Sequence, residues 1–264
     1  MRRRAAKTCR AIQAGWGSGG PIRGVGMPVI SLANTKGGAG KTTAALLLAS
    51  EYVRQGYRVA VLDADPQKWI TNWYETGGKD PSLTVISEVT VASMQTHIRE
   101  MRDQIDFFII DLPGQRDPLL ATALGLSDHV LIPVQGCAMD AKGAAQVIEL
   151  LAHMKKQANI TIPHSVVLTR VSSIATTRAL SAIKDLLVSR GVNVLETPIF
   201  ERSAFRDIFD LGTMLHKADP ARITNLDKAR ENARVLALEL KRLMPAKRRE
   251  QPMGLAARLR QRAA

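Results

Sequence analysis

The stretch that decides the fold is Thr35-Lys36-Gly37-Gly38-Ala39-Gly40-Lys41-Thr42-Thr43. An apolar run at residues 29–33 precedes it, and an Ala/Leu-rich helical pattern follows over residues 42–54. A strand, a glycine-rich turn and a helix in this order place several backbone N–H groups around one point at a helix N-terminus, and such a point binds phosphate. The strict pattern G-x-x-x-x-G-K-[ST] is missed at its first position, which holds Thr35, and a second lysine, Lys36, stands at the front of the loop. The stretch therefore predicts a nucleotide-binding loop.

The residue types of this loop predict individual roles. Lys41 would reach the β- and γ-phosphates, and the Thr42 hydroxyl would bind Mg²⁺. The expected cofactors are therefore ATP, or another nucleoside triphosphate, and magnesium. The residues expected to bind the nucleotide within the loop are Gly37, Gly38, Ala39, Gly40, Lys41, Thr42 and Thr43.

From residue 27 onward, short apolar runs alternate with helical patterns. This alternation predicts an α/β fold of the P-loop NTPase type, with a mostly parallel sheet and helices on both faces. The predicted strands are residues 29–33, 59–62, 83–86, 107–110, 130–134, 166–168 and 192–195. The predicted helices are residues 42–54, 68–75, 91–102, 117–124, 140–156, 176–189 and 220–243.

Acidic residues stand where two of the predicted strands end. The second strand runs into Asp63 and Asp65, and the fourth runs into Asp111, followed by a Pro-Gly turn at residues 113–114. Chemistry in such a sheet gathers at the carboxyl ends of the strands. A carboxylate fixed there, near the loop threonine, would hold Mg²⁺ directly or through a water molecule.

The charge of the chain is concentrated at its two ends. The net charge is +13 over 264 residues, but residues 1–26 carry +6 and residues 241–264 carry +7, which leaves residues 27–240 formally neutral. We expect three segments: a disordered basic leader at 1–26, an ATPase domain at 27–244 and a basic C-terminal tail at 245–264. Translation could instead begin at Met27, which would remove the leader. The two cysteines, Cys9 and Cys137, are far apart, which favours a reducing cytosol and no structural metal.

Three motifs together resemble the deviant Walker A, Walker A′ and Walker B signatures of the ParA/MinD ATPases. They are Lys36-Gly37-Gly38-Ala39-Gly40-Lys41-Thr42-Thr43, Asp63-Ala64-Asp65-Pro66-Gln67 and Ile110-Asp111-Leu112-Pro113-Gly114. The resemblance covers about residues 27–240. Residues 132–135, 201–205 and 212–216 look most like plasmid-borne ParA proteins, especially the branch that assists conjugative or T-DNA transfer.

The resemblance implies an ATP-sandwich homodimer. In such a dimer Lys36 would reach the partner subunit's phosphates, and Asp65 would orient or activate the attacking water. Asp63 and Asp111 would complete the metal surroundings, and Gly114 would let its loop respond to the γ-phosphate. The catalytic residues are then Lys36, Asp65 and Lys41, and the metal residues are Thr42, Asp63 and Asp111. Because one positive group comes from the other subunit, hydrolysis should be slow without an activating partner.

Two functions follow as alternatives. One is a cytoplasmic DNA-segregation or positioning ATPase, most directly for plasmid partition, which binds DNA nonspecifically as an ATP dimer and responds to a ParB-like activator. The other is an adaptor that recruits a relaxase–DNA complex to a transfer apparatus. Basic residues of the last third would form the DNA surface. The segment 253–260 is only weakly amphipathic, so stable membrane binding is not expected.

Overall fold

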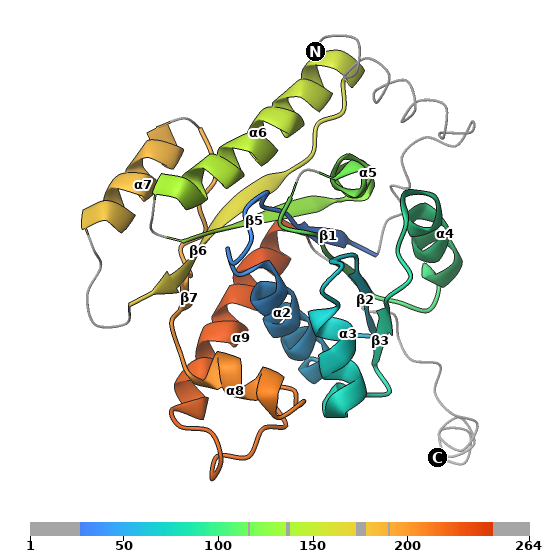
Figure 1. Cartoon of the computed structure of the whole chain (residues 1–264), viewed down its shortest axis with the longest axis vertical. Coiled ribbons are helices and arrows are strands. Elements are labelled where there is room, and N and C mark those ends of the chain that lie inside the picture. The colour runs from blue at the N-terminus through green and yellow to red at the C-terminus, as the bar shows by residue number, and fades with distance from the viewer. Residues whose placement is uncertain (1–26, 116, 136–137, 173–177, 190, 245–264) are drawn as a thin grey trace, which may run out of the picture.

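The computed structural model describes residues 27–115, 117–135, 138–172, 178–189 and 191–244 (Figure 1). The predicted leader at 1–26 and the predicted tail at 245–264 lie outside these residues. Within the described part of the chain, no helix is long and apolar enough to cross a bilayer.

A seven-stranded sheet forms the centre of the molecule, with the strand order β3-β2-β4-β1-β5-β6-β7. Every neighbouring pair runs parallel, as the alternation of strands and helices predicts. The strands are β1 Val29–Leu32, β2 Val59–Asp63, β3 Leu83–Ile86, β4 Phe107–Asp111, β5 His129–Gln135, β6 His164–Val171 and β7 Ile199–Phe200. The phosphate loop leaves β1, which lies between β4 and β5.

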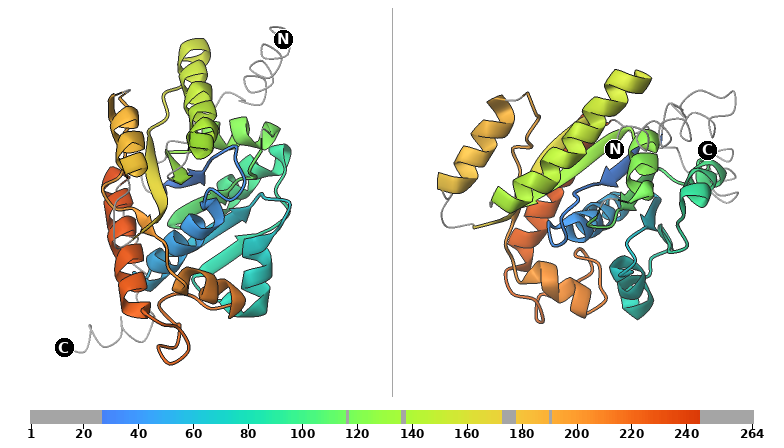
Figure 2. Two further views of the ribbon diagram at one scale, coloured as in Figure 1. Left: turned by 60° about the vertical axis from the view of Figure 1, so that its left-hand side comes forward. Right: turned by 45° about the horizontal axis from the view of Figure 1, so that its top comes forward.

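Helices cover both faces of the sheet, because the buried strands carry apolar side chains on both sides. Phe107 and Ile109 of β4 belong to one apolar cluster, and Phe108 and Ile110 belong to the other. The first cluster includes α2 Lys41–Arg54, α3 Trp69–Trp73, α8 Ala204–Asp210 and α9 Leu226–Leu243. The second includes α4 Val91–Met101, α5 Pro118–Leu126, α6 Ala138–Ala158 and α7 Arg178–Ser189. The right-hand view of Figure 2 separates α6 and α7 on one side from α8 and α9 on the other.

Two predicted elements near the C-terminus are wrong in position. Residues 192–195 form only an isolated bridge, between Val194 and Val166, and the edge strand is β7 at Ile199–Phe200. Pro198 separates the two segments, and a proline has no N–H to continue a ladder. The last helix begins at Leu226 rather than at residue 220, because Asp219 accepts hydrogen bonds from following N–H groups and closes a turn there.

Of two short helical segments, α8 was not predicted, and the one that follows α3 lies only partly within the predicted helix at residues 68–75. α8 has seven residues, too few for a clear helical period. After α3, the chain continues into η1 Tyr74–Gly78, a π-helical turn. Gly77 of this turn lies so close to the carbonyl oxygen of Gly212 that a Cβ at residue 77 would be 2.8 Å from it. η1 therefore packs against the turn that follows α8.

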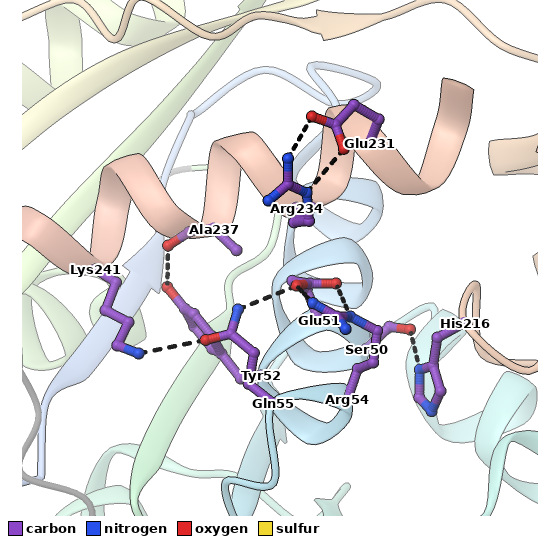
Figure 3. A network of polar contacts seen from close by, with 10 residues as sticks. All are labelled: Ser50, Glu51, Tyr52, Arg54, Gln55, His216, Glu231, Arg234, Ala237 and Lys241. Atoms are coloured by element: carbon purple, nitrogen blue, oxygen red, sulfur yellow. Dashed lines mark hydrogen bonds and ion pairs between the residues drawn. The ribbon is translucent and has the colours of Figure 1, made fainter. Parts of the chain in front are cut away.

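Polar contacts join α2 to α9 (Figure 3), and an aromatic stack joins α2 to the sheet. Tyr52 stacks on Phe107 with ring centroids 4.2 Å apart, and its hydroxyl donates to the Ala237 carbonyl over 3.4 Å. Glu51 accepts hydrogen bonds from Arg54 and Gln55, and Gln55 accepts one from Lys241. These contacts fix the C-terminal half of the helix that begins at the phosphate loop.

His129 at the start of β5 predicts a pH dependence of stability. Burial, together with the nearby His164, lowers the pKa of His129 to about 4. In the unfolded chain its pKa returns to about 6.5, so between these values the unfolded state binds a proton that the folded state does not. Stability should therefore fall as the pH decreases from about 6.5 to about 4, by up to about 3 kcal/mol from this residue.

Urea unfolding of the wild type and of His129→Gln at pH 7 and pH 4.5 measures this contribution. The wild type should lose more free energy of unfolding on acidification than the variant does. An equal loss in both proteins would show that His129 is not the source.

Candidate nucleotide-binding site

The loop between β1 and α2 has the conformation that a phosphate site needs. Gly38 and Gly40 have φ angles of 77° and 95°, in the left-handed region that favours glycine. The buried Asn34 side chain holds the start of the loop: its amide donates to the Pro133 carbonyl over 2.7 Å, and its oxygen accepts the Lys36 N–H over 2.9 Å. The glycines thus turn the chain, and Asn34 ties it to β5.

Three further side chains make contacts that hold the loop to distant segments. Gln135, at the end of β5, donates to the Gly38 carbonyl, and Thr169 of β6 donates to the Ala39 carbonyl over 2.9 Å. The Thr35 hydroxyl donates to Gln146 of α6 over 2.6 Å. These contacts, like those of Asn34, were not predicted from the sequence. Gln135 and Thr169 lie near the carboxyl ends of their strands, so the rule that predicted the acidic residues also applies to them.

Lys41 is the first residue of α2, and its ammonium group lies inside the loop. Only 5% of the residue is exposed, and Nζ donates to the Lys36 carbonyl over 3.3 Å. Burial lowers the pKa of Lys41, and the nearby Asp111 and Asp65 oppose this effect. The predicted phosphate-binding lysine therefore lies beside two of the predicted acidic residues, and Thr42 and Thr43 follow it in the same first turn.

Asp63 and Asp111 lie side by side, because β2 and β4 are neighbours and pair in register at these two residues. Both are buried. One oxygen of Asp63 accepts hydrogen bonds from the N–H and hydroxyl of Thr71, over 2.9 and 2.7 Å. The other Asp63 oxygen and both Asp111 oxygens are buried, with no hydrogen-bond partner among the described residues. Burial, with repulsion from Asp63, raises the pKa of Asp111 to about 7, although the nearby Thr42 hydroxyl opposes the rise.

These residues fit a magnesium ion bound to a nucleotide. Two adjacent carboxylates with unpaired oxygens need a counter-charge, and carboxylate, hydroxyl and water oxygens are the ligands that Mg²⁺ takes. Within the described ranges, no group of three or more His, Cys, Asp or Glu side chains could hold a metal. Mg²⁺ usually keeps several waters and binds substrate phosphates together with one or two carboxylates, and Asp63 and Asp111 could supply these carboxylates.

Asp65 and Gly114 belong to two different turns, and both lie near the phosphate loop. Asp65 is half-buried, its Oδ1 accepts the Gln67 N–H over 2.9 Å, and its charge acts on both Lys41 and Asp111. Gly114 packs against the front of the phosphate loop: a Cβ there would be 2.7 Å from the Gly37 Cα and 2.8 Å from the Gly37 nitrogen. The structure thus brings the three sequence motifs together. Lys36 is half-buried at the front of the loop, next to the exposed Gly37 and Gly38.

The basic residues of the last third are mostly engaged within the chain. Arg230 donates to the backbone carbonyls of Leu215, His216 and Ala218 over 3.1, 3.2 and 2.9 Å, so it holds the segment before α9. Arg234 pairs with Glu231, as Figure 3 shows. Three further basic residues also have partners: Lys217 pairs with Asp80, Arg206 pairs with Glu201, and Lys241 lies over the Tyr57 ring. Arg222 and Lys228 are exposed.

A cavity of about 220 Å³ lies between α2 and α9. Its charged residues are already paired within the chain: Glu51 with Arg54, Asp227 with Arg230, and Glu231 with Arg234. Its lining on α2 runs from Leu47 to Arg54, the rest comes from residues 215–216 and from α9, and no residue of the phosphate loop takes part. The cavity is therefore distinct from the nucleotide site.

Fold and site together define a P-loop ATPase of the deviant-Walker, ParA/MinD class. The chain matches the family model described as VirC1 protein over residues 27–246, and it therefore belongs to this family. It is 34% identical over 214 residues to Protein ParA of Rhizobium radiobacter, covering 81% of this chain and 96% of the relative. It is 29% identical over 195 residues to Protein virC1 of Rhizobium rhizogenes, covering 72% of this chain and 83% of the relative.

A solved structure shows the same fold. The structure of a Cyanothece McdA variant in complex with ATP superimposes with a TM-score of 0.65 at 17% sequence identity, over 86% of this chain and all of that chain.

Proposed function

We propose that this protein is a cytoplasmic, Mg²⁺-dependent ATPase that segregates or positions DNA, most directly a plasmid. The observation that carries the proposal is the meeting of three groups at one edge of the sheet. They are the phosphate loop with its buried Lys41, the unpaired oxygens of Asp63 and Asp111, and the half-buried Asp65. Membership of the VirC1 family, and the identity to a ParA protein, support it.

The residues of this chain would share the work of phosphoryl transfer. Lys41 and the backbone N–H groups of residues 37–43 would hold the phosphates, and Thr42 and Asp111, with Asp63, would hold Mg²⁺. The bound ion would neutralise charge that develops on the phosphate oxygens. The Asp65 carboxylate would accept a hydrogen bond from the attacking water and orient it. Lys36 would contact the phosphates of a second subunit, so ATP would close a homodimer.

In this proposal the ATP dimer binds DNA without sequence preference, and a ParB-like partner stimulates slow hydrolysis and release. Because Arg230 holds the segment before α9, a substitution there would disturb the fold together with any DNA contact. Arg222 and Lys228 are the better probes, since both side chains are exposed.

The test is duplex DNA binding by the full chain in ATP, in ADP, and for Lys36→Ala in ATP, across a salt series. We expect binding to be markedly tighter in ATP, and this gain to be lost in Lys36→Ala. The affinity should fall steeply with salt, with a slope of about −0.9 for each phosphate contact. Replacing both Arg222 and Lys228 with alanine should make the slope shallower by up to about two contacts.

Equal binding in all three conditions would contradict the ATP switch and would indicate that the basic ends of the chain hold DNA. A second function would then gain support: an adaptor that recruits a relaxase–DNA complex to a conjugative or T-DNA transfer apparatus. The resemblance of residues 132–135, 201–205 and 212–216 to the transfer-assisting branch supports this alternative. Capture of a relaxase by the purified protein, without stimulation by a ParB-like partner, is the result expected for the adaptor.

A further inference from the structure

Lys68 occupies an unusual position in the turn between β2 and α3. Its φ and ψ angles are 52° and 37°, in the left-handed region, where a side chain with a Cβ costs about 1 kcal/mol relative to glycine. The described residues include few non-glycine positions of this kind, and Lys68 is the one that lies between the Walker A′ carboxylates and a helix. Such a backbone persists where the surroundings fix it.

Two hydrogen bonds of the Lys68 side chain fix this backbone conformation. Nζ donates to the Asp63 carbonyl oxygen over 2.8 Å and also to the Ser87 carbonyl oxygen. Asp63 ends β2, and Ser87 follows β3, the neighbouring strand at the edge of the sheet. The half-buried ammonium group therefore joins the carboxyl ends of two strands.

The backbone of Lys68 closes the turn that carries Asp65. The Lys68 N–H donates to the Asp65 carbonyl over 3.0 Å, and the Lys68 carbonyl accepts the Asn72 N–H over 2.9 Å as α3 begins. Within the same turn, the Gln67 N–H donates to the Asp65 carboxylate. A displacement of Lys68 would thus move the group whose charge acts on Lys41 and Asp111.

We infer that Lys68 is a positioning residue: its ammonium group anchors the turn of residues 63–68 to the β3–α4 connection and thereby holds the Asp65 carboxylate beside the phosphate loop. The role in hydrolysis rests on the proposed ATPase function. The anchoring itself is a property of the fold and can be measured without a nucleotide.

Three substitutions separate the contribution of the Lys68 ammonium group from that of the left-handed backbone. Lys68→Met removes the ammonium group and keeps a long side chain on the left-handed backbone. Lys68→Gly removes the ammonium group and relieves the backbone. Lys68→Arg keeps a donor group that can reach two carbonyl oxygens.

The first measurement is amide hydrogen exchange of the peptide covering residues 64–70 in the full chain, without nucleotide. We expect exchange at least about tenfold faster in Lys68→Met and Lys68→Gly, and close to wild type in Lys68→Arg. The midpoint of thermal unfolding of each variant shows whether the rest of the fold is retained. Unchanged exchange in Lys68→Met would overturn the inference whatever the ATPase result.

The second measurement separates turnover from binding. In Lys68→Met and Lys68→Gly, kcat for ATP should fall about 10- to 100-fold through displacement of Asp65, while the Kd for ATP stays within a few-fold of wild type. Lys68→Arg should recover most of kcat. If Lys68→Gly hydrolyses ATP like the wild type, the Lys68 side chain only stabilises its own left-handed backbone and does not position Asp65. The inference then fails. If the wild type itself hydrolyses no ATP with any partner, the proposed function fails, and the exchange experiment still decides the anchoring role.

Discussion

Replacing Gly114 with alanine should reduce ATP turnover by about 100-fold while the protein remains folded. The added Cβ would lie 2.7 Å from the Gly37 Cα and 3.1 Å from the Lys36 carbonyl carbon. These neighbours are backbone atoms, so they cannot rotate away as the end of a side chain can. Either the phosphate loop or the turn after β4 must move, and a shift of about 1 Å in catalytic geometry is enough for a loss of this size.

The measurement is steady-state ATP hydrolysis together with the thermal unfolding midpoint. Gly125→Ala is the matched control, since it makes the same change in α5, where the nearest atom to the new Cβ is the flexible Met154 end at 3.7 Å. We expect Gly125→Ala to hydrolyse ATP like the wild type and to be slightly more stable, by about 0.5–1 kcal/mol, because alanine favours a helix. Normal turnover in Gly114→Ala would show that the two turns do not constrain each other.

Lys41→Met should weaken ATP binding by at least about 100-fold, because the site then lacks the charge that pairs with the phosphates. The same change should leave the nucleotide-free protein as stable as the wild type or more stable. The reason is that burial disfavours the charged form of Lys41 and so lowers its pKa, and methionine places no charge in this buried position. Loss of this positive charge should also raise the pKa of Asp111 further.

Equilibrium titration with ATP and Mg²⁺, combined with thermal unfolding with and without nucleotide, tests both parts. The control is Lys184→Met on α7, a partly exposed lysine paired with Glu196. It should bind ATP like the wild type, and ATP should raise its unfolding midpoint as it raises that of the wild type. Tight ATP binding by Lys41→Met would show that Lys41 does not bind the phosphates.

The fold class and the centre of the site were predictable because they depend on local order in the sequence. A strand, a glycine-rich turn and a helix in succession predict a phosphate loop wherever they occur, and alternation with further strands predicts a parallel sheet. Asp63 and Asp111 were identified by the same reasoning, since the residue that ends a parallel strand faces the functional edge of the sheet. The bounds of α8, α9 and β7 were not predictable, because Pro198 and the turn at Asp219 act through single residues without a period.

The sequence by itself determined the parallel α/β fold, and it predicted a nucleotide site with Lys41, Asp63 and Asp111 in it, because these expectations follow from residue type and position at the strand ends and in the loop. Only the tertiary structure decided how these groups are held. It placed Asp111 next to Asp63, Gly114 against Gly37 and Thr169 against Ala39, in contacts between segments that are far apart in the chain. It also showed Arg230 holding the backbone before α9, and Lys68 bridging two strand ends. Charge and spacing can be read from the sequence, whereas the partner of a side chain depends on how distant segments pack against each other.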